Sequence, residues 1–158
     1  MNIFYLDPTP SICAEYHCDK HVVKMILESA QMLCTSHRLN GRDDSILYKV
    51  THQNHPSSKW ARESTANYLW LYDLFSNLCA EYTHRYSRTH LTESKLHSIL
   101  SRPPELADAE FTEPPQCMPE QYHQEDTVEA YRQYYLAEKT SLLCWTHRDI
   151  PAWTHQRL

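Results

Sequence analysis

Hydrophobic positions recur at helical spacing through residues 11–38, where Val22, Met25, Ile26 and Leu33 belong to one broad apolar side. Pro10 suits the first turn of a helix, and Asn40-Gly41 supplies a stop. The pattern predicts one continuous helix over 11–38. A short extended segment, NIFYLD, precedes it.

Three further helices are predicted along the chain from their start and stop signals. The proline-rich residues 101–124 separate the last of them from the others and are predicted to form a long loop. The predicted spans are 57–86 after Pro56, a short helix from Thr92 to just before Pro103, and 127–145 capped by Asp126.

The predicted fold class is therefore all-α. We expect a single domain, residues 1–158, built as a helical bundle with three long helices, a short N-terminal extended segment and a Pro-rich loop. Composition supports this, because Gly41 is the only glycine in the chain. Gly-rich phosphate loops and the glycine-flanked nucleophile elbow of serine hydrolases are thereby excluded, and a sheet protein with many tight two-residue hairpins is disfavoured.

Charge and cysteine usage bear on partners and location. The formal net charge is −5, whereas duplex DNA binding draws its affinity from a surplus of Lys and Arg. No apolar run is long enough to cross a bilayer, and the N-terminus lacks the features of a signal peptide. The six cysteines form no CxxC pair, so we expect reduced thiols in a cytoplasmic protein without a membrane partner.

A polar stripe follows one side of the first predicted helix. Its members recur every three or four residues and so share a face. Lys24 and Glu28 on this stripe are spaced for an i,i+4 ion pair, and the stripe suits either a solvent face or a cleft. The stripe comprises His17, His21, Lys24, Glu28, Gln31 and Thr35.

Polar and aromatic residues also gather where the second predicted helix begins. Free N–H groups and the helix dipole at such a start favour an anion such as phosphate. The aromatic members could stack on a base, although packing in the core is the more common role. The candidate ligand-binding residues here are His55, Ser57, Ser58, Trp60, Arg62, Asn67 and Tyr68.

The last predicted helix carries a third group, Tyr131, Arg132, Tyr135 and Lys139, at helical spacing. Interleaved aromatic and basic side chains suit stacking on a base together with phosphate pairing. Packing of the tyrosines with solvated basic residues is the alternative.

A metal site was weighed because the chain has eleven histidines. Cys13, His17 and His21 stand at i, i+4 and i+8, but no HExxH motif or paired-cysteine spacing accompanies them. We therefore expect neither a metal ion nor another cofactor.

Two segments resemble the pyrimidine-dimer DNA glycosylase family, a group of small all-helical phage enzymes. Asp19-Lys20-His21, six further residues and then Glu28 are similar to the family's Asp-x-His followed by its catalytic glutamate. Near the C-terminus, YRQYYLAEK is similar to the family's Tyr-x-Tyr-Tyr run close to a lysine. The block DKHVVKMILESAQML also resembles small phage proteins.

The resemblance implies an all-α fold and a catalytic role for Glu28. The family attacks the sugar C1′ with the α-amine of a small residue at position 2, exposed after Met removal. Here the position holds Asn2, whose bulk disfavours removal of Met1. We therefore expect Met1 to stay, and hydrolysis without the amine, because a helix-borne glutamate can stabilise oxocarbenium charge unaided.

Together these observations lead to the hypothesis of a phage-type, nucleotide-directed enzyme that cleaves an N-glycosidic bond. Glu28 is its predicted catalytic carboxylate, with a pKa tuned by Lys24 and His21. The candidate residues of the other two groups would hold phosphate and stack on the base. Since the chain is acidic, a small nucleotide is favoured over DNA.

The specific substrate proposed is a cyclic dinucleotide antiphage signal, which would make the protein a counter-defence factor in the host cytoplasm. The alternatives are a DNA glycosylase of the pyrimidine-dimer repair type, a non-catalytic nucleotide-sequestering protein, and a structural or interaction protein. The sequence leaves open the base recognised, the oligomeric state and any role of the N-terminal amine.

Overall fold

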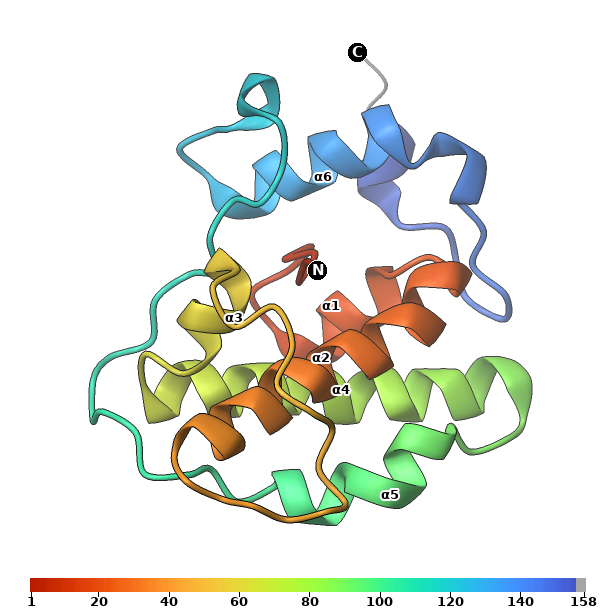
Figure 1. The fold of residues 1–158 in the computed structure, drawn as a ribbon. Coiled ribbons are helices and arrows are strands. Elements are labelled where there is room, and N and C mark those ends of the chain that lie inside the picture. The colour runs from red at the N-terminus through yellow and green to blue at the C-terminus, as the bar shows by residue number, and fades with distance from the viewer. Residues whose placement is uncertain (156–158) are drawn as a thin grey trace.

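The computed structural model describes residues 1–155, which form helices and connecting segments with no β-strand among them. The predicted all-α, single-domain fold class is confirmed (Figure 1). None of the helices in these residues is both long and apolar enough to cross a membrane. The α-helices are α1 (Pro10–Tyr16), α2 (Asp19–Leu39), α3 (Pro56–Ala61), α4 (Thr65–Tyr86), α5 (Leu91–Leu100) and α6 (Thr127–Glu138), and the short 3₁₀ helices are η1 (Glu120–Tyr122), η2 (Thr140–Leu142) and η3 (Ala152–His155).

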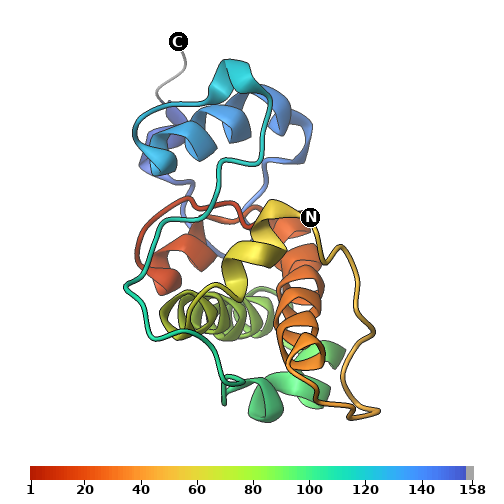
Figure 2. The ribbon, with the colours of Figure 1, turned by 60° about the vertical axis from the view of Figure 1, so that its left-hand side comes forward.

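Helix α2 lies at the centre of the larger group of helices, where it packs against α4, α5 and α3. The fully buried side chains of this group of helices include Met25 and Leu33 of α2 and Phe75 of α4. Helix α6 lies apart from this group, and the N-terminal segment runs between them in both views (Figure 1, Figure 2). Ile3 and Leu6 of that segment are consequently buried.

The prediction of one helix over 11–38 is wrong at a single point, where His17 and Cys18 adopt extended backbone between α1 and α2. The carbonyl of His17 accepts a hydrogen bond from Arg85 at 2.8 Å. The amide of Cys18 donates to the Tyr135 hydroxyl at 2.8 Å. Partners 68 and 117 residues away therefore satisfy the backbone groups that a helix break exposes.

The prediction of one helix over 57–86 is also wrong, because α3 ends at Ala61 and α4 begins at Thr65. The Ser64 side chain caps α4 by accepting from the amide of Asn67 at 3.0 Å. This cap satisfies an amide at the new helix start, so the chain can turn here without losing that hydrogen bond.

The last helix begins as predicted, since the Asp126 carboxylate caps α6 by accepting from the amide of Glu129. It ends at Glu138, short of the predicted residue 145. The chain instead turns back to α2, where the Cys144 carbonyl accepts from the Asp19 amide and the Asp19 carboxylate accepts from Thr146. These contacts at the start of α2 replace the missing helical turns.

The two remaining predicted elements are close to the observed ones. Helix α5 begins at Leu91, one residue before the predicted start, and ends at Leu100. The proline-rich segment is a loop crossed only by the short η1. Its Thr112 carbonyl accepts from the indole N–H of Trp60 at 2.9 Å, which ties the loop to α3.

Candidate active site

Glu28 lies in the middle of α2 between two cationic groups. Its Oε1 atom is 3.6 Å from the α-amine of Met1, and its Oε2 atom is 3.9 Å from Lys24 Nζ. The Glu28 side chain is 15% exposed and that of Lys24 is 64% exposed. A partly exposed carboxylate beside an amine can both stabilise positive charge and accept a proton.

The α-amine reaches Glu28 because the N-terminal segment folds back over α2. Phe4, which has a positive φ of 55°, stacks on the His21 ring with the ring centroids 4.3 Å apart. Positive φ is uncommon for a bulky residue and persists only where the surroundings hold it. The stack with His21 is one such contact, and it fixes the segment that carries Met1.

His21 therefore serves packing in this structure and does not contact Glu28 directly. It is buried, and its Nδ1 atom shares a 2.8 Å hydrogen bond with the Tyr135 hydroxyl. Burial lowers the pKa of His21 to about 3, assisted by His17, Lys139 and Lys24. His21 and Glu28 are seven residues apart on α2, a separation of about 10 Å along the helix.

Protonation of the buried histidines predicts acid sensitivity of the fold. Burial also lowers the pKa of His17, to about 4. Below the ordinary histidine pKa of about 6.5 the unfolded chain binds protons that the folded chain does not. Stability is therefore complete above that pH and is lost as the pH falls toward 4.

We expect the free energy of unfolding to fall by roughly 2 kcal/mol between pH 6 and pH 5, the effect of about two protons. Urea denaturation at stepped pH measures this. His21→Gln should remove about half of the slope, whereas His123→Gln at an exposed position should leave it unchanged. A flat pH dependence in the wild type would contradict the assignment of two neutral buried histidines.

Residues of α6 hold the N-terminal segment from the other side. Arg132 donates from Nε to the Leu6 carbonyl at 2.9 Å, and its guanidinium lies over the Trp153 ring. Tyr135 is fully buried by its contacts with Cys18 and His21. Lys139 Nζ lies 5.1 Å from the centre of the Tyr134 ring. Arg132 and Tyr135 are thus occupied by groups of the protein itself.

The predicted polar cluster at the start of α3 splits in two. His55 caps α3 by accepting from the Ser57 amide, and burial lowers the pKa of its ring, assisted by the positive charge of the N-terminus. Glu28 acts on the same ring in the opposite direction, so His55 belongs to the surroundings of the amine. Ser58 accepts a hydrogen bond from Arg62 at 3.1 Å and faces the protein interior.

The aromatic and amide residues predicted to face a ligand lie in the protein interior in this structure. Trp60 and Tyr68 are buried, and the Tyr68 hydroxyl donates to the Leu100 carbonyl at 2.7 Å. The Asn67 side chain is likewise buried, with donor contacts to Trp60 and Thr112. These three residues form core and loop contacts, and Tyr135 joins them for the same reason.

Cys13, His17 and His21 do not share one helix face as a metal site of this spacing requires, because the break after Tyr16 places Cys13 and His21 on different helices. Among residues 1–155 there is no group of three or more His, Cys, Asp or Glu placed to hold a metal ion. The Cys13 thiol donates instead to the Phe4 carbonyl at 3.3 Å.

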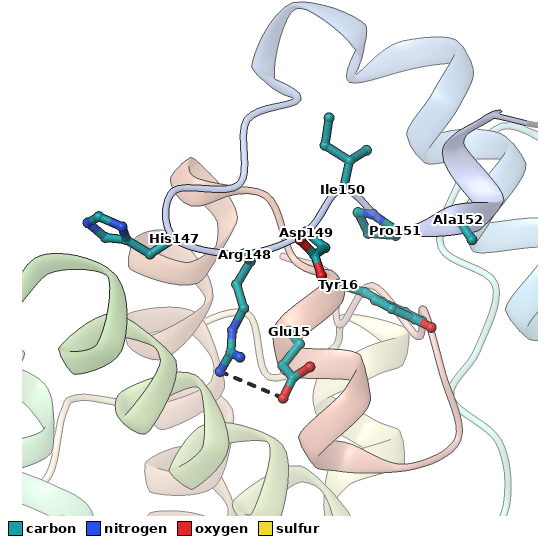
Figure 3. Close-up of a pocket in the computed structure, with 8 residues that line it drawn as sticks. All are labelled: Glu15, Tyr16, His147, Arg148, Asp149, Ile150, Pro151 and Ala152. Atoms are coloured by element: carbon teal, nitrogen blue, oxygen red, sulfur yellow. Dashed lines mark ion pairs between the residues drawn. The ribbon is translucent and has the colours of Figure 1, made fainter.

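A hollow of about 670 Å³ lies at the C-terminal segment and is a different feature from the surroundings of Glu28 (Figure 3). Arg148 spans it toward Glu15 at 3.7 Å, as Figure 3 shows. Arg148 also pairs with Glu81 of α4 at 2.9 Å. These ion pairs connect the C-terminal segment to α1 and α4.

Sequence reasoning missed the contribution of three residues to the surroundings of Glu28, namely Met1, Asn2 and Phe4. The signal for Met1 was the family's use of an N-terminal amine, which the bulk of Asn2 had argued against. The structure brings the amine of Met1 itself to Glu28, so the argument from Asn2 does not exclude an amine from the site.

Comparison with known proteins identifies a family that the chain matches. The family model described as pyrimidine dimer DNA glycosylase matches residues 1–94, which is more than half of the 158 residues. This confirms the resemblance seen at Asp19, His21 and Glu28. No curated protein and no solved structure matches the chain. The matched segment ends within α5, so the proline-rich loop and α6 lie outside it.

Proposed function

Because this chain belongs to the pyrimidine dimer DNA glycosylase family, we propose that it cleaves the N-glycosidic bond of a damaged pyrimidine in DNA. The observation that carries the proposal is the 3.6 Å contact between Glu28 and the α-amine of Met1. A carboxylate and an amine in contact are the two groups needed to attack a sugar C1′ and to stabilise the charge that develops there.

In the proposed reaction the Met1 ammonium first loses a proton to solvent, and the neutral amine then forms a bond to C1′ while the bond from C1′ to the base breaks. The electron pair of the broken bond leaves with the base, which takes up a proton from solvent. Glu28 stabilises the positive charge on the sugar and accepts the proton that the attacking nitrogen sheds. Ring opening then gives an imine between Met1 and the sugar. Loss of a C2′ proton from this imine breaks the bond from C3′ to its phosphate oxygen, so the phosphate leaves with the electron pair and the strand is cut, and water then hydrolyses the imine.

Water could replace the amine as nucleophile, with Glu28 in the same two roles. That route would leave no covalent link between protein and sugar, and borohydride reduction separates the two routes because it traps only an imine. The bulk of Asn2 favours the water route, whereas the position of the Met1 amine supports the amine route.

The two candidate substrates are DNA and a small nucleotide. Family membership supports DNA, while the net charge of −5 was the argument for a small nucleotide such as a cyclic dinucleotide. The helix that bears Glu28 also exposes Lys20 and Lys24, so it carries two cations available for phosphate, of which Lys24 lies beside the carboxylate. Local charge of this kind can offset an unfavourable net charge.

The test offers the purified protein UV-irradiated supercoiled plasmid, unirradiated plasmid and a panel of nucleotides that includes cyclic dinucleotides. We expect nicking of the irradiated plasmid, a borohydride-trapped adduct, and binding that weakens steeply with added salt. Nucleotides should be recovered intact by mass spectrometry.

Base release from a cyclic dinucleotide, with irradiated plasmid untouched, would overturn the DNA proposal in favour of the small-nucleotide hypothesis. Nucleotide binding without turnover of any probe would instead favour the sequestering alternative.

A further inference from the structure

The side chain of Asn2 bridges the N-terminus and the proline-rich loop. Its Nδ2 atom donates to the carbonyl of Cys117 at 2.8 Å, across 115 residues of sequence. Its Oδ1 atom accepts from the amides of Ile3 and Phe4 at 2.7 and 3.4 Å. Both ends of one carboxamide are therefore used next to the residue that carries the amine.

The loop side of this bridge is itself held in place. The Cys117 amide donates to the hydroxyl of Tyr131, a fully buried residue of α6. The Cys117 Sγ atom lies 3.4 Å from the Ser57 hydroxyl on α3. The Cys117 carbonyl, which accepts the hydrogen bond from Asn2, is thus held in place by contacts of Cys117 with α6 and α3.

Met1 is fixed by its side chain as well as by Asn2. The Met1 side chain is only 1% exposed and packs against the core. Consecutive Cα atoms are 3.8 Å apart, so removal of Met1 would withdraw the amine from Glu28 by about that distance. The side chain and the α-amine of Met1 therefore both contribute to the packing around Glu28.

We propose that Asn2 is a positioning residue that holds the α-amine of Met1 against Glu28 by tying the N-terminus to the Cys117 carbonyl. The functional part of this inference rests on the proposed function. A residue too large for methionine removal thereby becomes part of the site, and the proline-rich loop outside the matched family segment completes it.

A zero-length carbodiimide cross-link tests the position of the amine without any substrate. Carbodiimide activates the Glu28 carboxylate, and whichever amine attacks it forms an amide with net loss of one water. Lys24 competes with Met1 for the same carboxylate from 3.9 Å, which supplies an internal reference. Mass spectrometry of the intact protein first verifies that Met1 is present, and peptide mapping then gives the ratio of the two links.

We expect the Met1–Glu28 link in the wild type and a fall of about tenfold or more in its ratio to the Lys24–Glu28 link in Asn2→Leu. Asn40→Leu is the matched control, because Asn40 donates to the Ser36 carbonyl at the same 2.8 Å but at the far end of α2. Asn2→Asp keeps the acceptor for Ile3 and loses the donor to Cys117, so it should give the same fall in the ratio of the two links. It serves as the test variant if Asn2→Leu does not fold.

An unchanged ratio in the Asn2 variants, or no Met1–Glu28 link in the wild type while the Lys24 link forms, would overturn the proposal. On irradiated plasmid, Asn2→Leu should lower kcat about tenfold or more with little change in KM. If the wild type turns over no DNA, the proposed function fails, and the cross-link ratio still decides the position of the amine.

Discussion

Glu28→Gln is expected to lower turnover by a factor on the order of a hundred or more while leaving substrate binding in place. Glutamine has nearly the same shape, so it fits a side chain that is 15% exposed between Met1 and Lys24. It carries no charge to stabilise the developing positive charge at the sugar, and it cannot accept the proton of an attacking amine. Single-turnover kinetics on irradiated plasmid, with binding measured separately, give the two quantities.

Lys24→Gln is the matched control for this variant, because it removes the other partner of the same ion pair. Lys24 is 64% exposed, and exposed ion pairs contribute little, so the rate of the chemical step should stay within about threefold, whereas loss of a cation available for phosphate should weaken substrate binding. Full turnover by Glu28→Gln would remove the catalytic assignment. Loss of its fold would show that the carboxylate serves stability instead.

The extents of the helices were predictable where local pattern decides them. Apolar spacing and the cap at Asp126 gave the all-α class and the start of α6, and proline gave the loop. The break at His17 was not predictable, because its hydrogen-bond partners Arg85 and Tyr135 are distant in sequence. The break before α4 carried a local signal, the cap at Ser64, that the unbroken run of helix formers obscured.

The candidate site likewise contains residues that were predictable from the sequence and residues that were not. Glu28 and Lys24 were predictable, since their spacing on one helix face requires no tertiary information. The amine of Met1 was not, because its place depends on the N-terminal segment folding between α2 and α6. Aromatic residues such as Tyr68 look alike in a stacking site and in a core, and only burial separates the two roles.

The surroundings of Glu28 also depend on residues outside the segment that matches the family model. Cys117 in the proline-rich loop anchors Asn2, and Tyr135 and Arg132 of α6 hold His21 and Leu6. All three lie after residue 94, where the family match ends. The later part of the chain therefore acts as a clamp on the N-terminal segment, and changes there should reach Glu28 through the position of Met1.

Arg85→Met is expected to destabilise the fold by about 3–5 kcal/mol, the usual result of breaking a buried ion pair from one side. The Arg85 side chain is fully buried and donates to Glu81 at 2.8 Å, to Asp19 at 3.0 Å, and to the carbonyls of Glu15 and His17. Methionine fills similar space but leaves these acceptors without their donor. Urea denaturation at neutral pH measures the loss.

Arg42→Met is the matched control, since Arg42 pairs with Asp44 at an exposed position and should change stability by at most about 0.5 kcal/mol. Arg148→Met removes the other guanidinium on Glu81 from a half-buried position and should have an intermediate effect. A loss below about 1 kcal/mol for Arg85→Met would contradict the role assigned to this cluster.

The loss of stability in Arg85→Met should also depend on pH, and the pKa shifts of the Asp19 and Glu81 carboxylates determine the direction. Burial would raise the pKa values of Asp19 and Glu81, but hydrogen bonds from Thr146 to Asp19, and from Arg148 and Arg85 to Glu81, outweigh it and lower both. A lowered carboxyl pKa contributes stability that is complete above the ordinary pKa of about 4 and is lost as the pH falls through the folded value. The difference between wild type and Arg85→Met should therefore be largest near neutral pH and shrink below about pH 4. A difference that stays constant on acidification would show that Arg85 acts through the carbonyls of the helix break, which do not titrate, and not through these carboxylates.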